Sequence, residues 1–278
     1  MAENIRIGFI GFGSMGQAIC DGLIRTGTVP PACICASGRN QEKLRDNTQK
    51  RGIAACESTA AVVSASDIVL LCVKPNQVKE ALSPEALGVD AEAPGAAERA
   101  AEILSDKALI SIVSGFDYDA CQKFLPAEYH HLSTIPNTPV ASGQGVFVCE
   151  QKHSLTEEQL AAFKDVFSQI AILEFLPTEL MGPAEVIAGC APAYAAMMIE
   201  ALGDAGVKFG LSRDTAYRLA AQMMAGTGAL AVQTGQHPAA MKDAVCTPGG
   251  STIVGVQSLE RSGFRSALIE AVDAVMHR

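Results

Sequence analysis

The chain lacks an excess of basic residues, because it holds 21 Lys and Arg against 30 Asp and Glu over 278 residues, for a net charge of −9. Binding to a nucleic-acid backbone requires clustered Lys and Arg, so we expect no nucleic-acid partner. The balance suits a cytoplasmic enzyme. A small acidic substrate is still compatible with it, because a local site can be positive on an acidic protein.

Paired cysteines and a targeting signal are also missing. The nine cysteines are scattered, and none stands in a CxxC pair. We therefore expect buried, reduced thiols and no metal site.

No secretory signal is recognisable. The longest apolar run, residues 186–199, is too short to span a bilayer and contains Pro192, so we expect no membrane association.

Short apolar segments alternate with helical ones in the first half of the chain. The segment DIVLLCV at 67–73 is apolar throughout, which is typical of a parallel strand buried on both faces. The alternation predicts an α/β fold with a Rossmann-type doubly wound parallel sheet. Residues 84–102, rich in Ala, Glu, Pro and Gly, are expected to form a solvated surface excursion without function. The strands are expected at 5–10, 32–36, 67–73 and 108–113, and the helices at 15–24 and 41–50.

The pattern changes after Leu176, where helical spacing takes over. Gly210 is expected to end one helix and Ser212 to cap the next, which runs over 213–234. We expect an all-α C-terminal domain. Residues 1–177 would then form the dinucleotide-binding domain, and residues 178–278 a helical domain for dimerisation and substrate binding. Long apolar stretches and small residues in these helices predict a homodimer.

A glycine motif follows the first expected strand. The sequence GFIGFGSMG places three glycines in a GxGxxG pattern between a strand and a helix. The first glycine permits the tight turn, the second lets the backbone approach a pyrophosphate, and the third lets helix and strand pack closely. The motif predicts a dinucleotide site formed by Gly11, Phe12, Gly13, Ser14, Met15 and Gly16.

No carboxylate follows the second expected strand, where an NAD site has Asp or Glu for the ribose 2′-hydroxyl. The sequence there is Ala-Ser-Gly-Arg-Asn. A hydroxyl at Ser37 and a cation at Arg39 would suit a 2′-phosphate, so the predicted cofactor is NADPH, with NADH possible. Arg39 as a solvated surface charge is the alternative.

A second glycine segment, CTPGGST, lies between two expected helices. Backbone N–H groups can converge at Gly249 and Gly250, and the following helix starts at Ser251 or Thr252. That arrangement can hold an anion between hydroxyls. An ordinary inter-helix turn, capped by one of those hydroxyls, is the alternative.

Motifs along the whole chain resemble those of pyrroline-5-carboxylate reductases. The most specific is the segment from Val245 through Leu259-Glu260, which is similar to the family signature S-P-G-G-T-T followed by a helix ending in Leu-Glu. The others, in order, are GFIGFGSMG at 8–16, VKP at 73–75, IPNTP at 135–139, PAY at 192–194, IEAL at 199–202, and the pairs His237-Pro238 and Lys242-Asp243.

The resemblance implies hydride transfer from NAD(P)H to the cyclic imine 1-pyrroline-5-carboxylate, giving L-proline in the last step of proline biosynthesis. It also implies dimers assembled into a larger ring. The cofactor cleft would be lined, beyond the glycine motif, by Val73, Lys74, Pro75, Ser114, Gly115 and Asn137. Lys74 as a solvated strand-end charge, and Asn137 as part of an Asn-Thr-Pro turn, are the alternatives.

The substrate site that the resemblance implies is the CTPGGST segment. The substrate carboxylate would lie on the N–H groups of Gly250, Ser251 and Thr252, next to Gly249, with the Thr247 hydroxyl at the opposite rim. Thr252 would act catalytically by offering its hydroxyl to the imine nitrogen. Glu179, near the domain junction, is a further candidate to face the substrate.

Two other functions compete with this interpretation. A β-hydroxyacid dehydrogenase shares the layout but has a catalytic Lys early in the first long helix after the Rossmann domain, and residues 185–204 contain none. A non-catalytic dinucleotide-sensing module would leave the CTPGGST segment unexplained. NADPH oxidation with pyrroline-5-carboxylate, and none with 3-hydroxyacids, separates the three.

Overall fold

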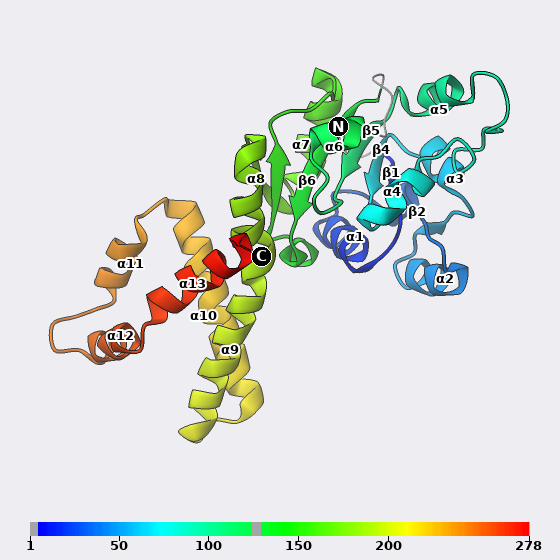
Figure 1. Cartoon of the computed structure of the whole chain (residues 1–278). Helices are drawn as coiled ribbons and strands as arrows, with labels where there is room; N and C mark the ends of the chain where they lie inside the picture. Colours follow the sequence, from blue (N-terminus) through cyan, green and yellow to red (C-terminus); the bar gives the residue numbers. More distant parts are fainter. Residues whose placement is uncertain (1–4, 124–128, 278) are drawn as a thin grey trace. The chain divides into compact units, whose positions relative to one another are not determined.

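The computed structural model describes residues 5–123 and 129–277. The chain divides into two compact units, Met1–Gly189 and Cys190–Arg278, and each has its own architecture (Figure 1). This division falls later in the chain than the expected boundary between residues 177 and 178, which stays a prediction.

The first unit is built on one sheet, which has eight strands in the part of the chain that the structure describes. Their order is β3-β2-β1-β4-β5-β6-β7-β8, and every pair is parallel except β6 with β7. The chain crosses from β1 to β2 on one side and returns to β4 on the other, so β1 marks the switch point where ligands bind in such sheets. The predicted Rossmann-type sheet is confirmed. The strands are β1 Ile7–Ile10, β2 Ile34–Ser37, β3 Ala54–Ala55, β4 Ile68–Leu71, β5 Ala108–Ser111, β6 His131–Pro136, β7 Gly145–Glu150 and β8 Ala171–Leu176.

Helices cover both faces of the sheet, as the burial of β4 shows. Ile68 and Leu70 belong to one apolar core, and Val69 and Leu71 to a second one on the opposite face. This alternation follows from the two-residue period of a strand and explains why the segment is apolar throughout. The helices of this unit are α1 Ser14–Thr26, α2 Gln41–Gln49, α3 Thr59–Ser64, α4 Val78–Ala81, α5 Ala96–Leu104, α6 Tyr118–Gln122, α7 Glu157–Phe167 and α8 Thr178–Glu185.

The prediction of a solvated excursion at 84–102 holds only in part, because about half of these residues are exposed but several are buried in the core. Leu87 and Val89 are buried in the second core, and the segment continues into α5, whose buried face includes Ala96, Ala100 and Leu104. The four-residue spacing of these positions places them on one side of a helix. The composition, rich in Ala and Glu, concealed that amphipathic pattern.

The regular elements of the second unit are all helices in its described residues, as predicted. The Ser212 side chain caps α10 by accepting a hydrogen bond from the Thr215 N–H, and Gly235 ends that helix with φ +62°. A Cβ on Gly203 would come within 2.2 Å of the Tyr217 ring, so α9 and α10 pack closely only because that residue is glycine. The helices are α9 Ala191–Lys208, α10 Arg213–Thr234, α11 Pro238–Ala244, α12 Ser251–Arg261 and α13 Phe264–Met276.

The apolar run at 186–199 is part of a longer helix than the sequence indicated. A π-helical turn, Val186–Cys190, joins α8 to α9, so the helix runs over 31 residues, Thr178–Lys208, and is long and apolar enough to cross a membrane by length and composition alone. Large apolar side chains are exposed on several helices of this unit, not on this helix alone. They include Met197, Phe209, Leu219, Val232, Val254 and Ile269.

Candidate functional site

The glycine turn after β1 forms one wall of a cavity of about 970 Å³. Gly11 has φ +87°, and a Cβ there would lie 2.7 Å from the Cys72 carbonyl oxygen. A Cβ on Gly13 would meet nothing within 4 Å, whereas one on Gly16 would lie 3.3 Å from the Gly11 carbonyl oxygen. The three glycines thus have the separate roles that the motif predicts: a left-handed turn, an open approach and close packing.

The N-terminus of α1 is available to an anion. Gly13 occupies the cap position, and no side chain caps the helix. The first N–H groups, those of Ser14 and Met15, therefore have no partner within the helix, and both residues line the cavity. Phe12 also lines the cavity. The residue is 9% exposed, and its ring packs edge-on against Phe9 with 5.5 Å between the ring centroids. That packing holds the turn against the core.

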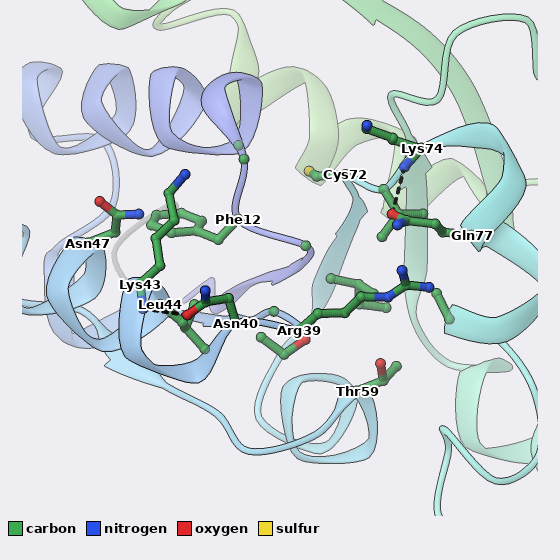
Figure 2. Close-up of a pocket in the computed structure, with 18 of the residues that line it drawn as sticks. Phe12, Arg39, Asn40, Lys43, Leu44, Asn47, Thr59, Cys72, Lys74 and Gln77 are labelled. Carbon is green, nitrogen blue, oxygen red and sulfur yellow. Dashed lines mark hydrogen bonds between the residues drawn. The ribbon is translucent and has the colours of Figure 1, made fainter.

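The end of β2 and the start of α2 form the second wall. Ser37, Arg39 and Asn40 all line the cavity. Asn40 caps α2, because its side-chain oxygen accepts from the Lys43 N–H at 2.9 Å (Figure 2). Lys43 also lines the cavity, although it was not expected there from the sequence. A cation three residues after a helix cap was the signal that could have found it.

The predicted segment after β4 forms a third wall. Val73 and Lys74 line the cavity as expected, whereas Pro75 does not line it and instead starts a short 3₁₀ turn, Pro75–Gln77. The Lys74 N–H donates to Gln77 Oε1 at 3.2 Å, as Figure 2 shows, which fixes the turn. Beside them, burial raises the pKa of the Cys72 thiol, so this thiol stays protonated and is no nucleophile at neutral pH.

Ser114, Gly115 and Asn137 are not among the residues that line this cavity. The Ser114 hydroxyl donates to Glu185 Oε1 at 3.0 Å. The Asn137 amide is occupied at both ends: its oxygen accepts from the Val146 N–H at 2.9 Å, and its nitrogen donates to the Ala188 carbonyl at 3.0 Å. This geometry favours the turn interpretation of Asn137.

The CTPGGST segment forms a tight turn in the helical unit. The Gly250 N–H donates to the Thr247 carbonyl oxygen at 2.9 Å, and Gly249 has φ +71°. Pro248 followed by a left-handed glycine is typical of a type II turn. The Gly250 N–H is thereby engaged, which corrects the expectation that it is free to hold a carboxylate.

The helix after this turn begins at Ser251, as predicted, with Gly250 at the cap position and no side-chain cap. The N–H groups of Ser251 and Thr252 are left for a ligand, and both residues are exposed. A Cβ on Gly250 would lie 2.4 Å from the Thr247 hydroxyl oxygen. A side chain at Gly250 would therefore displace that hydroxyl. Glu179 is exposed on the first turn of α8.

Comparison with known proteins identifies the family to which this chain belongs. Residues 178–278 match the family model described as pyrroline-5-carboxylate reductase dimerisation, and residues 6–94 match one described as NADP oxidoreductase, coenzyme F420-dependent. A pyrroline-5-carboxylate reductase of Treponema pallidum is 42% identical over 276 residues, which cover 98% of this chain and 99% of that one. The chain belongs to the pyrroline-5-carboxylate reductase family.

Other members of the pyrroline-5-carboxylate reductase family agree. The Escherichia coli reductase is 34% identical over 273 residues, covering 98% of this chain and 96% of its own. A Plasmodium falciparum pyrroline carboxylate reductase with NADP bound matches with a TM-score of 0.78 and 28% identity, over 99% of this chain and 97% of that one. The Coxiella burnetii structure matches with a TM-score of 0.80 and 26% identity over the same shares.

Proposed function

We propose that this chain reduces 1-pyrroline-5-carboxylate to L-proline with NADPH, as the last step of proline biosynthesis in the cytoplasm. The observation that carries the proposal is the family membership, at 42% identity over nearly the whole chain. The glycine-turn cavity and the uncapped start of α12 supply the two binding features that the reaction needs.

The cofactor fits the first of these features. Gly13 is open where a Cβ would have free space, and the uncapped α1 terminus favours phosphate charge. Ser37 and Arg39 would bind the 2′-phosphate, and Lys74 would lie beside the cofactor at the end of β4. When bound, NADPH supplies the hydride. Ser114 and Gly115, after β5, are proposed for the nicotinamide side because ligands bind at the carboxyl ends of such strands.

The substrate would be held by the start of α12. Its carboxylate would accept from the N–H groups of Ser251 and Thr252, since a helix N-terminus carries about half a positive charge. The Thr247 hydroxyl, fixed by the turn through Gly249 and Gly250, would be the opposite rim. The Thr252 hydroxyl would orient the imine nitrogen, which can carry its own proton at neutral pH and needs no strong acid.

Assembly would complete the enzyme. The match of residues 178–278 to a dimerisation model supports a homo-oligomer. A second copy of the chain would cover the exposed apolar residues of α9 and α10. We propose that these dimers build a larger ring. Glu179 is exposed at the start of this matched region, and we propose it as a further residue that faces the substrate.

The experiment that tests the proposal is a substrate comparison. Purified protein should oxidise NADPH steadily when 1-pyrroline-5-carboxylate is added, and proline should accumulate in equal amount. With NADP⁺ and 3-hydroxyacids, no reduction should occur. Turnover of 3-hydroxyacids would favour the dehydrogenase interpretation, and binding of NADPH without any turnover would favour a sensing module.

A further inference from the structure

Arg39 and Glu80 form an ion pair at the edge of the cofactor cavity. Arg39 follows β2, and Glu80 belongs to α4, so 41 residues separate them in the sequence. Both residues line the cavity, and their side chains are 63% and 68% exposed. Figure 2 shows the Arg39 side chain crossing from the side that carries Asn40 toward the side that carries Gln77.

The pair changes the charge balance of the site. The sequence has no carboxylate after β2, yet the structure brings one to the same place from α4. The guanidinium that would bind a 2′-phosphate is therefore already bound to a carboxylate in the free protein. A phosphate at this position would meet both a cation and, next to it, an anion.

We propose that Glu80 sets the preference between NADPH and NADH by competing with the 2′-phosphate for Arg39. The inference rests on the proposed function, in that the cavity is taken to bind a nicotinamide dinucleotide. NADPH must displace or approach the Glu80 carboxylate, whereas NADH, which has a hydroxyl at this position, does not. Glu80 lowers the affinity for NADPH and leaves that for NADH nearly unchanged.

The effect of Glu80 on NADPH affinity should be modest, because the Arg39–Glu80 pair is exposed to solvent. Ion pairs between solvent-exposed side chains are weak, because water and salt screen them. A phosphate monoester carries close to two negative charges at neutral pH and binds guanidinium strongly, so it displaces the carboxylate. To do so it must break the Arg39–Glu80 ion pair, and the energy of that pair is lost from NADPH binding. Removing the Glu80 charge should therefore tighten NADP⁺ binding by about three- to tenfold.

The test is a double-mutant cycle read by calorimetric titration with NADP⁺ and with NAD⁺. Glu80→Gln should lower the Kd for NADP⁺ about three- to tenfold and change the Kd for NAD⁺ less than about twofold. In an Arg39→Gln background, Glu80→Gln should have no such effect, since there is no guanidinium to compete for. Glu85→Gln is the matched control: Glu85 is exposed on the same segment and is not among the cavity-lining residues.

Three outcomes overturn the inference. The first is weaker NADP⁺ binding in Glu80→Gln, which would mean that the carboxylate holds Arg39 in position for the phosphate. The second is a change in Kd that is the same for NADP⁺ and NAD⁺, or that Glu85→Gln reproduces. Either result would show that the effect comes from the net charge of the protein and not from the ion pair. The third is an unchanged Kd for NADP⁺. Because the readout is binding, these results stand apart from the proposed function, which fails if the unaltered protein does not reduce pyrroline-5-carboxylate.

Discussion

Gly11 lies against the backbone of Cys72, so that a Cβ on Gly11 would be 2.7 Å from the Cys72 carbonyl oxygen. The contact joins the turn after β1 to the end of β4, and the Gly11 N–H donates to the Ser37 carbonyl oxygen at the end of β2 at 3.0 Å. One glycine therefore connects the three strand ends that surround the cofactor cavity.

Gly11→Ala should abolish tight cofactor binding. The new methyl group would collide with backbone, and φ +87° is unfavourable for any side chain, for a total cost of about 1–3 kcal/mol in unfolding free energy. Calorimetric titration with NADP⁺ and thermal unfolding measure both effects. Gly27→Ala is the control: Gly27 also has positive φ, at the end of α1, but a Cβ there meets nothing within 4 Å. It should lose stability and keep its affinity for NADP⁺.

Thr252→Ala should lower kcat by about ten- to a hundredfold, because the hydroxyl orients the imine nitrogen without being its only source of a proton. Thr252→Ser should recover most of the activity, since it keeps the hydroxyl. Ser258→Ala, at an exposed position on the same helix, should leave kcat and KM unchanged. Full activity in Thr252→Ala would make Thr252 a helix-terminal residue without a catalytic role.

Leu219→Asp should dissociate the oligomer. Leu219 is 58% exposed on α10, so a single copy loses little packing when it is replaced, whereas a covered apolar interface would have to bury the new charge. Light scattering should report a monomer, with helical content by circular dichroism retained. Gln222→Asp introduces the same charge at an exposed position on the same helix and serves as the comparison. A native protein that is already monomeric at micromolar concentration contradicts this account of the helical tail.

His131 should make stability fall on acidification. It is fully buried in β6 and stacks on Tyr118 at 4.6 Å, and burial lowers its pKa to about 4. Because the folded pKa lies below the unfolded one, the unfolded state binds more protons in between. The stabilisation is present above about pH 6.5 and is lost as the pH falls toward 4.

His131→Phe keeps the stacking and removes the titration. Its loss of unfolding free energy between pH 7 and pH 5 should be about 2 kcal/mol smaller than that of the unaltered protein. Urea unfolding at one fixed protein concentration measures this difference. An equal loss in both proteins would show that other groups dominate acid unfolding.

The sequence predicted what is local. The glycine turn, the caps of α10 and the start of α12 depend on neighbouring residues, and each was found where expected. The burial of α5 was missed because small alanines form its apolar face. The partners of Arg39 and Asn137 were also out of reach, since Glu80 and Ala188 lie 41 and 51 residues further along the chain. Only the folded sheet brings such residues together.

Hydride transfer from NADPH to the imine carbon can be followed by isotope labelling. NADPH carrying deuterium at the transferable position of its nicotinamide should be incubated with the protein and 1-pyrroline-5-carboxylate, and the proline formed should be analysed by mass spectrometry. We expect proline that is one mass unit heavier, with the deuterium on the ring carbon that was double-bonded to nitrogen. Unlabelled proline, or no proline while NADPH is consumed, would contradict it.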